Sequence, residues 1–592
     1  MTVGAAHGSA VGGSGDSGSG SGAAGVPLSA AEAVVAGLVA AGVREVFGIA
    51  GGKFAALLEA LSREPRLRWT GVRHEAAAAF MATAVAHRTG RLAVCIAEMG
   101  PGALNLASGL DTAHTNHLPV LALTVGTPAS LSDPDHGVLM QFDAPSVFGA
   151  LTKWRATVRD ARRLPELMAR AVRETATGAP GPVHLEIGYD LLGTPAPCAT
   201  AWEVDAVISA AGLVARAPAD AESAARAADL LAGARRPLII AGGGAVASEA
   251  SGEVRSLAAT LDAPVIVTQM GIGTVGSDDP HLVGQGGLVF GDSVLRALSE
   301  ADVVLAVGCR FSSWMWDGMR PAGAENAEQR LIHLDRDPTV IGRLRPATVG
   351  LVGDARAVLE QIGDALGPST AGGADPGWRA GLRDEHLAHR ARIAGLGAGE
   401  ADPMHPAQLA RALGEALPAD ALVVYDGAHT AFWSNDLTPV SEPRTRFHDS
   451  GSGHLGFGVP YAHALALLEP GRAVVDITGD GAFGFTVAEL DTAVRYGISV
   501  VHVIHDNQAW GVIAQSQKRL GFELGTGLEG TDYAAIARGF GAHGEHVRAV
   551  HEVGPALTRA LAAGGPAVID ARVRFDPHPG MPRFGAMGRE RH

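Results

Sequence analysis

Short apolar runs alternate with alanine-rich stretches of helical spacing along most of the chain. The runs are bounded by glycine, proline or charged residues, as is typical of buried strands. Alternation of this kind predicts parallel sheets with helices on both faces, which is an α/β fold of doubly wound domains. Strands are expected in three groups, at 45–48, 92–96, 120–124 and 183–187, then at 237–241, 264–268, 303–307 and 331–334, and then at 422–425, 473–477, 500–504 and 567–571.

Two stretches without strong periodicity separate these groups, and both are interpreted as linkers. Residues 194–222 carry scattered prolines, and residues 367–399 are rich in glycine and charge. The first 26 residues form a Gly/Ser-rich tract with no basic start and no apolar segment, so we expect a disordered extension and no targeting peptide. The predicted units are an extension over 1–26, domains over 27–195, 220–365 and 402–575, and a tail over 576–592.

Composition narrows the classes of partner and compartment. With 592 residues, 47% of them hydrophobic and 18% charged, the chain is long enough for several cores. A net charge of −15 without a basic block argues against nucleic acid, and no apolar run is long enough for a membrane span. Cys95, Cys198 and Cys309 lie far apart without a CxxC pair, so a cytoplasmic protein without disulfides or zinc is expected.

The segment 476–485, DITGDGAFGF, indicates a strand, a glycine turn and a following helix. The helix is expected over 486–496, with Thr486 and Glu489 spaced as a capping box. A second strand then ends just before Asn507. Because a right-handed crossover returns the chain to the same edge of the sheet, Asp480 and Asn507 are expected to lie close together.

These oxygen-bearing groups suit one divalent cation. A carboxylate from Asp480, an amide oxygen from Asn507 and the main-chain carbonyl of Ala509 are hard ligands of the kind that Mg²⁺ takes together with phosphate oxygens. The small residues Gly481 and Ala482 let a diphosphate approach the backbone at the start of the helix.

Gly-Asp-Gly followed by the distant Asn507 resembles the signature of thiamin diphosphate-dependent enzymes, with Asp506 in place of a first asparagine. The resemblance implies thiamin diphosphate and Mg²⁺ as cofactors. It extends to the first domain, where residues 46–52, 98–105 and 118–124 are similar to acetolactate synthase and its relatives. It then implies that Glu75, at the end of a short strand over 70–75, hydrogen-bonds N1′ of the cofactor's aminopyrimidine.

The same resemblance implies further cofactor and substrate contacts. Leu455, in the glycine-rich stretch 449–460, occupies the bulky position that holds the cofactor in its bent form. The resemblance implies a substrate contact by Gln141. Trp510, by its size and its place beside the thiazolium, is expected to contact the cofactor and the acceptor substrate. The remaining residues expected to contact the cofactor are Gly51, Gly52, His429 and Gly511.

The chain departs from acetolactate synthases at several substrate-side positions. Ala50 stands where proline is expected, and Lys53 stands where a small residue is usual. Ser516 replaces the tryptophan by which biosynthetic enzymes favour 2-oxobutanoate, and Trp510 replaces a smaller apolar residue. These departures weigh against branched-chain amino acid biosynthesis as the role.

The resemblance assigns the three domains, in order, as pyrimidine-binding, central and diphosphate-binding. In the central domain, segments 242–245, 284–287, 308–311 and 333–338 match positions that bind FAD in acetolactate synthases or ADP in oxalyl-CoA decarboxylase. In this superfamily the pyrimidine-binding domain of one subunit faces the diphosphate-binding domain of another, which implies a homodimer or homotetramer.

Three functions remain open from the sequence. The first is a decarboxylase or carboligase acting on a small 2-oxo acid. The second is a lyase of an acyl-CoA, because 426–430 and 481–485 resemble oxalyl-CoA decarboxylase and 2-hydroxyacyl-CoA lyase. The third is a non-catalytic nucleotide-binding relative, which the presence of Glu75, Asp480 and Asn507 disfavours.

Overall fold

The structure is a computed structural model that describes residues 25–132, 134–195, 197–211, 215–287, 289–312, 328–367, 373–399 and 401–580. The predicted extension therefore falls almost wholly outside the described residues, as does the end of the predicted tail. Three six-stranded parallel sheets build three α/β domains, as the alternating pattern predicts. No described helix has the length and apolarity of a membrane span.

The N-terminal domain contains a sheet of strand order β3-β2-β4-β5-β7-β6. Its strands are β2 (Glu45–Gly48), β3 (Arg68–Gly71), β4 (Ala93–Ala97), β5 (Val120–Gly126), β6 (Trp154–Val158) and β7 (Val183–Gly188). Its main helices are α1 (Ala30–Ala40), α2 (Ala55–Ser62), α3 (Glu75–Thr89), α4 (Pro101–Thr115), α6 (Ala144–Gly149), α7 (Leu164–Ala176), α8 (Tyr189–Gly193) and α9 (Ala201–Ala211).

The central domain contains the order β11-β10-β9-β12-β13-β14. Its strands are β9 (Pro237–Ala241), β10 (Val265–Thr268), β11 (Leu282–Gly286), β12 (Val303–Val307), β13 (Arg330–Asp335) and β14 (Val349–Val352). Its helices include α10 (Ala221–Ala232), α11 (Gly243–Ala247), α12 (Ser251–Leu261), α13 (Asp292–Glu300) and α15 (Ala355–Leu366).

The C-terminal domain follows a long connecting helix, α16 (Trp378–Gly395), and has the order β16-β15-β17-β18-β20-β19. Its strands are β15 (Leu422–Asp426), β16 (Arg446–Phe447), β17 (Val474–Gly479), β18 (Val500–Asp506), β19 (His543–Val547) and β20 (Pro566–Arg572). Its helices are α17 (Pro406–Ala416), α18 (Ala428–Leu437), α19 (Gly458–Leu468), α20 (Asp480–Thr486), α21 (Glu489–Tyr496), α22 (Gly511–Leu520), α23 (Tyr533–Phe540) and α24 (Val550–Ala562).

Three of the sequence-based expectations about local structure are wrong: the linkers, the single helix over 486–496 and its capping box. The stretch 194–222 contains helix α9, whose Val204, Ile208 and Ala211 are buried in the core of the N-terminal domain, and the stretch 367–399 contains α16. The single helix expected over 486–496 is divided, because α20 begins at Asp480 and α21 begins at Glu489. The expected capping box is absent, since Glu489 bonds to another domain.

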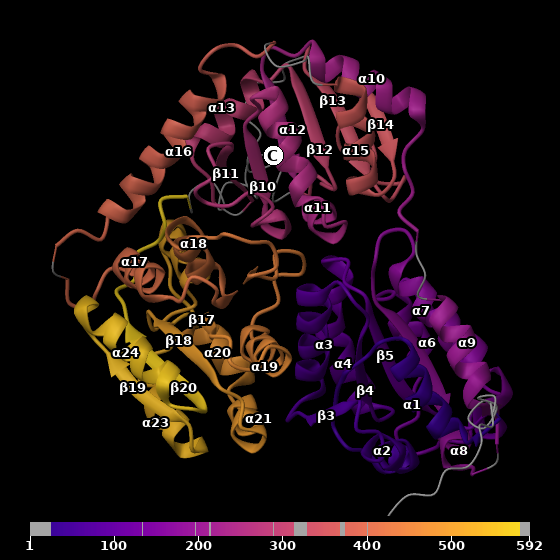
Figure 1. Cartoon of the computed structure of the whole chain (residues 1–592). Helices are drawn as coiled ribbons and strands as arrows, with labels where there is room; N and C mark the ends of the chain where they lie inside the picture. The colour runs from indigo at the N-terminus through magenta and orange to yellow at the C-terminus, as the bar shows by residue number, and fades with distance from the viewer. Residues whose placement is uncertain are drawn as a thin grey trace, which may run out of the picture.

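The N-terminal and C-terminal domains share one core within the chain. Helices α3 and α19 face each other between these two domains, below the central domain (Figure 1). The core cluster there includes Phe80 of α3 and Tyr461 of α19. Glu489 accepts hydrogen bonds from the backbone N–H groups of Arg73 and His74, both at 3.0 Å. The two domains are therefore joined immediately before Glu75.

Candidate active site

The carboxyl ends of β2, β3 and β4 place the expected pyrimidine-binding residues together. The strand expected over 70–75 is shorter, because β3 ends at Gly71, and Glu75 is instead the first residue of α3. Its Oε2 accepts a hydrogen bond from Asn105 Nδ2 at 3.0 Å. Gly51 precedes a short helical turn after β2, and a Cβ there would lie 2.5 Å from the Glu98 carboxylate. Gly52 follows it with open space where a Cβ would be. Ligands of parallel α/β sheets bind at this edge.

In the C-terminal domain, Asp480, Asn507 and Ala509 meet as the crossover predicts. The Ala509 N–H lies 3.2 Å from Asp480 Oδ2 and 3.1 Å from Asn507 Oδ1, so the two side-chain oxygens flank one amide. Both side chains are buried. Their positions follow from β17 and β18, which are adjacent parallel strands that end at Gly479 and Asp506.

The electrostatics of this cluster suit a cation. Burial raises the pKa of Asp480 to about 7, and the neighbouring Asp506 carboxylate adds to this shift. Arg572 contacts Asp506 at 3.3 Å, whereas the described residues place no basic side chain within 4.0 Å of the Asp480 carboxylate. A divalent ion would relieve this excess of negative charge, and the oxygen-only donor set is the one that magnesium prefers.

Polar atoms without partners mark the adjoining space. His429, on α18, is buried with neither ring nitrogen hydrogen-bonded, and burial lowers its pKa to about 4. Gly511 lies against it, because a Cβ on Gly511 would come within 2.7 Å of His429 Nδ1. A buried, neutral imidazole without a partner is costly unless a ligand completes its hydrogen bonds.

Glycines line the space beside His429, where larger side chains would not fit. Gly427 follows β15 and precedes α18, with φ at 91°, a left-handed conformation that favours glycine. A Cβ on Gly481 would lie 2.5 Å from the Trp510 ring. Ala482 follows in the first turn of α20. The starts of α18 and α20 thus offer N–H groups to an anion.

Leu455 lies half-buried in the loop before α19. This loop is held by Asp426, whose Oδ2 accepts hydrogen bonds from Gly456 N–H at 2.9 Å and Gly458 N–H at 2.8 Å. Burial raises the pKa of Asp426 well above its usual range. Asp426 is not among the predicted site residues, although its position at the end of a strand and directly before a glycine is a signal that the sequence offers.

Comparisons with known proteins agree with this geometry. Residues 28–147 match the N-terminal TPP binding domain of thiamine pyrophosphate enzymes, 224–362 their central domain and 426–571 their C-terminal TPP binding domain. A probable acetolactate synthase large subunit of Methanocaldococcus jannaschii is 30% identical over 580 residues, covering 95% of this chain and 94% of its own. The chain belongs to the acetolactate synthase family of thiamine pyrophosphate enzymes.

Bacterial and plant members of the acetolactate synthase family are similarly related. The large subunit of acetolactate synthase isozyme 2 of Escherichia coli is 31% identical, covering 92% of this chain and 96% of its own. The chloroplastic acetolactate synthase 2 of Zea mays is 30% identical, covering 95% and 88%. The two TPP-binding domains support thiamin diphosphate as the cofactor.

The expected site residues form two groups in the chain. Asp480, Gly481, Asn507, Trp510 and His429 gather in the C-terminal domain. Glu75, Gly51 and Gly52 gather in the N-terminal domain, and Gln141 lies half-buried on a loop of that domain. Helix α19 packs against α3 on one side and α20 on the other, and so separates the two groups (Figure 1).

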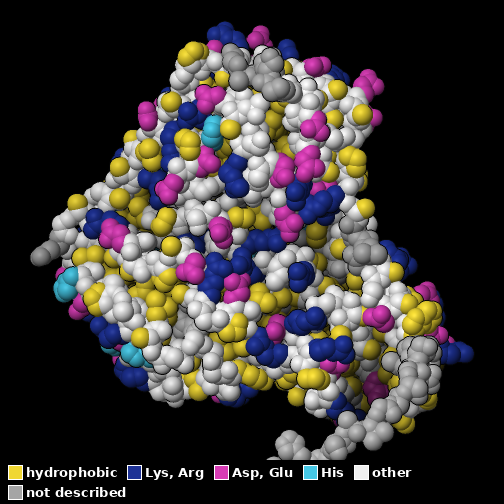
Figure 2. All heavy atoms as spheres, in the orientation of Figure 1, with side chains coloured by type: hydrophobic (Ala, Val, Ile, Leu, Met, Phe, Trp, Pro, Cys, Tyr) yellow, Lys and Arg dark blue, Asp and Glu magenta, His cyan; other side chains and the backbone are white. Residues whose placement is uncertain are grey.

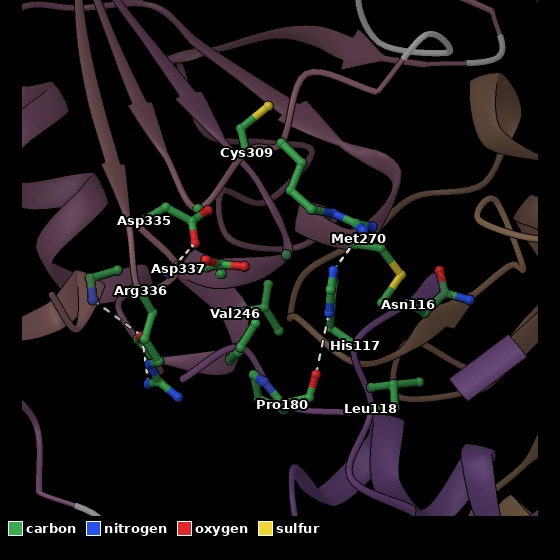
Figure 3. A pocket seen from close by; sticks show the side chains of 18 of the residues that line it. Asn116, His117, Leu118, Pro180, Val246, Met270, Cys309, Asp335, Arg336 and Asp337 are labelled. Atoms are coloured by element: carbon green, nitrogen blue, oxygen red, sulfur yellow. Dashed lines mark hydrogen bonds between the residues drawn. The ribbon is translucent and has the colours of Figure 1, made fainter. Parts of the chain in front are cut away.

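The glycine-rich segments of the central domain line a cavity of about 630 Å³ at its junction with the N-terminal domain. Its lining includes the central-domain residues Gly243, Gly244, Gly286, Gly287, 308–311 and 335–337, together with residues 114–119 of the N-terminal domain. Figure 3 shows His117 in the wall of the cavity, beside Pro180. Its Nδ1 lies 3.3 Å from the Pro180 carbonyl oxygen and its Nε2 lies 2.6 Å from Arg310. Basic side chains gather along this junction on the surface in Figure 2.

Proposed function

We propose that the protein is a thiamin diphosphate- and Mg²⁺-dependent decarboxylase and carboligase that acts on a small 2-oxo acid. The observation that carries this proposal is the convergence of Asp480 and Asn507 oxygens on the Ala509 amide, in a chain that also presents Glu75. The named relatives are acetolactate synthases over nearly their whole length, which supports 2-oxo acid chemistry.

Each group of residues has a distinct role in this proposal. Asp480, Asn507 and the Ala509 carbonyl hold Mg²⁺. Gly481, Ala482, His429 and Gly511 surround the diphosphate, while Leu455 supports the bent form of the cofactor beside Trp510. When bound, thiamin diphosphate supplies the carbon nucleophile and accepts electrons as CO₂ leaves.

Glu75 holds the proton at N1′ of the aminopyrimidine in this scheme. Asn105 orients the carboxylate through the hydrogen bond at 3.0 Å, and Gly102 leaves room beside it, because a Cβ there would lie 3.1 Å from Glu75 Oε1. A fixed carboxylate can keep one proton shared with a ring nitrogen, which is general acid-base catalysis by position.

We propose a homodimer or homotetramer with the active site between subunits. Apolar side chains remain exposed around the C-terminal group, with Phe485 at 62% and Leu524 at 76% of their surface accessible, and Leu104 on α4 is 48% exposed. A second copy that brings its N-terminal domain to this surface would cover them and complete the site. Sedimentation should show no monomer at working concentration.

We propose that the central cavity takes FAD or ADP. Its volume, its glycine-lined loops and its basic side chains Arg310 and Arg336 suit a nucleotide diphosphate. Flavin absorbance of the purified protein identifies FAD, and ADP-dependent stabilisation of a colourless protein identifies ADP.

The three cysteines form no disulfide, which supports a reducing cytoplasm as the location.

A substrate screen with thiamin diphosphate and Mg²⁺ tests the function. The proposal expects CO₂ and an acyloin-type acid from pyruvate or another small 2-oxo acid, and loss of both in Glu75→Gln. Formyl-CoA from oxalyl-CoA would instead assign the lyase. No turnover of any donor, with cofactor binding intact, would favour a nucleotide-binding role.

A further inference from the structure

Three chemically active side chains follow three adjacent strands at one edge of the N-terminal sheet. Lys53 follows β2, Glu75 follows β3 and Glu98 follows β4, and β2 lies between the other two. Because carboxyl ends of parallel strands share one edge, these residues belong to a single surface. Lys53 is the residue that departs from the small side chain expected at this place.

The contacts of Glu98 and Gly102 show how close the loop that carries Lys53 lies to Glu75. Glu98 Oε2 accepts the Lys53 backbone N–H at 3.0 Å. A Cβ on Gly102 would lie 3.1 Å from Glu75 Oε1 and 3.4 Å from Glu98 Cβ. The Lys53 backbone is therefore joined through the Glu98 side chain to the start of α4, which lies against Glu75, while the Lys53 Nζ extends to the Leu139 carbonyl.

The Lys53 ammonium carries a charge that no described carboxylate balances. Its Nζ donates to the Leu139 carbonyl at 2.9 Å and lies 6.0 Å from the centre of the Tyr189 ring. No described carboxylate lies within 4.0 Å of it, and both Glu98 oxygens accept backbone N–H groups, from Lys53 and Met99. An ammonium has three donors, so two remain for an anion.

The loop that Lys53 holds also carries Gln141. Lys53 Nζ bonds to the Leu139 carbonyl, and the next residue, Met140, has a φ of 70°, which is strained for a side chain other than glycine. Gln141 follows at once, and Leu139 is 79% exposed. Positively charged and amide side chains thus stand beside an exposed apolar side chain, which suits a small amphiphilic substrate.

We propose that Lys53 binds the carboxylate of the acceptor substrate and so selects a carboxylate-bearing carbonyl compound over a neutral aldehyde. The inference rests on the proposed carboligase function. The donor loses its carboxylate as CO₂, and its acyl carbon then bonds to the acceptor's carbonyl carbon while the acceptor oxygen gains a proton. The acceptor carboxylate alone survives this sequence unchanged.

Because only the acceptor keeps its carboxylate, we assign Lys53 to the acceptor and not to the donor. A cation that bound the donor's carboxylate would stabilise the charge that decarboxylation must remove, and would slow that step. A cation that binds the acceptor's carboxylate stabilises ground state and product alike, and orients the carbonyl for attack.

Paired acceptors test the selection. 2-Oxobutanoate and propanal share an ethyl group and differ by the carboxylate, so their competition for a pyruvate donor reports the contribution of charge. Lys53→Met is expected to lower the preference for 2-oxobutanoate by about tenfold or more, the loss of one charge-assisted hydrogen bond, and Lys53→Arg to retain most of it. Arg91→Met, an exposed position of the same domain, removes equal charge and should leave the preference unchanged.

Acylation of the holoenzyme gives a measurement independent of turnover. The chain has three lysines, Lys53, Lys153 and Lys518, so mass spectrometry can follow each one. 2-Oxobutanoate should protect Lys53 from acetic anhydride, relative to chloride at equal ionic strength, while Lys153 and Lys518 serve as internal controls.

The two measurements separate the two proposals. Turnover of 2-oxo acids with an unchanged acceptor preference in Lys53→Met and no protection of Lys53 would overturn the role of Lys53 alone. Protection of Lys53 without any turnover would overturn the carboligase function and leave an anion site. Loss of preference together with protection supports both.

Discussion

Removal of the Glu489 carboxylate tests the joint between the N-terminal and C-terminal domains. Glu489 is 1% exposed, and it accepts the backbone N–H groups of Arg73 and His74 and the Thr492 hydroxyl at 2.7 Å. His74 in turn caps α3, since its Nδ1 accepts the Ala76 N–H at 3.2 Å, and Glu75 lies between them. The carboxylate therefore sets both the domain contact and the start of α3.

The magnitude follows from the two hydrogen bonds that Glu489 accepts from the backbone N–H groups of Arg73 and His74 in the other domain. A bond to a charged acceptor contributes about 1.5–3 kcal/mol, and each donor left without a partner adds a desolvation cost. We expect Glu489→Ala to lower the free energy of unfolding by about 3–6 kcal/mol. Glu489→Gln keeps an acceptor oxygen for the two N–H groups, and the loss should be about 1–2 kcal/mol.

Urea unfolding, with exchange of the C2 proton of bound thiamin diphosphate as a second readout, measures both effects. The matched control is Glu552→Ala, because Glu552 also accepts two backbone N–H groups, at 2.8 and 3.0 Å, but faces solvent within one domain. That cap should cost about 1 kcal/mol and leave exchange unchanged. If Glu489→Ala were no less stable than the control and exchanged C2 normally, the domain joint would not position Glu75.

Four further changes test the site and its surroundings. Glu75→Gln should abolish C2 proton exchange while the affinity for thiamin diphosphate, measured by fluorescence, changes little; full exchange would remove Glu75 from the mechanism. Asn507→Ala should raise the Mg²⁺ concentration for half-maximal activity by about tenfold or more, and an unchanged requirement would contradict the ligand set. Gly481→Ala should lower the free energy of unfolding by about 1–3 kcal/mol, because its methyl group forces the Trp510 ring aside. In the double variant with Trp510→Leu most of that loss should vanish. If urea unfolding showed that the losses of the two single variants simply add, there would be no clash between the two side chains. Burial raises the pKa of Glu186 to about 7, so its contribution to stability is complete below about pH 4.5 and falls as the pH rises through 7. In Glu186→Gln, the loss of stability over that pH range should be smaller by about 1–3 kcal/mol. An unchanged dependence of stability on pH would show that the carboxyl is not buried in solution.

The inner strands of every sheet could be predicted from local pattern. In each domain the four inner strands were expected, and the outer ones were missed apart from part of β3. An inner strand is covered on both faces and reads as a continuous apolar run, as all five residues of β12 do. Several edge strands are only partly covered: β6 and β19 each bury one residue completely, and β14 alternates. The edge strands β11 and β16 are largely buried, but β11 contains three polar or glycine residues and β16 has only two residues, so neither gives a long apolar run.

The residues of the candidate site divide in the same way. Asp480 and Asn507 could be paired from sequence because a crossover connection has one hand and a fixed return edge. The prediction of a capping box at Thr486 and Glu489 was wrong, although both residues are of the types that form one. Thr486 donates instead to the Gly456 carbonyl, and Glu489 accepts hydrogen bonds from another domain. Spacing alone cannot tell a local partner from a distant one.

The sequence by itself determined the three α/β domains, the cofactor class and the positions of Glu75, Asp480 and Asn507. Only the tertiary structure decided that Glu489 joins two domains and that the Lys53 ammonium bonds to the Leu139 carbonyl with no described carboxylate within 4.0 Å. The physical reason is that periodicity records how deeply each residue is buried in its own element, whereas hydrogen bonds and charge pairs depend on which distant segments the folded chain brings within a few ångströms.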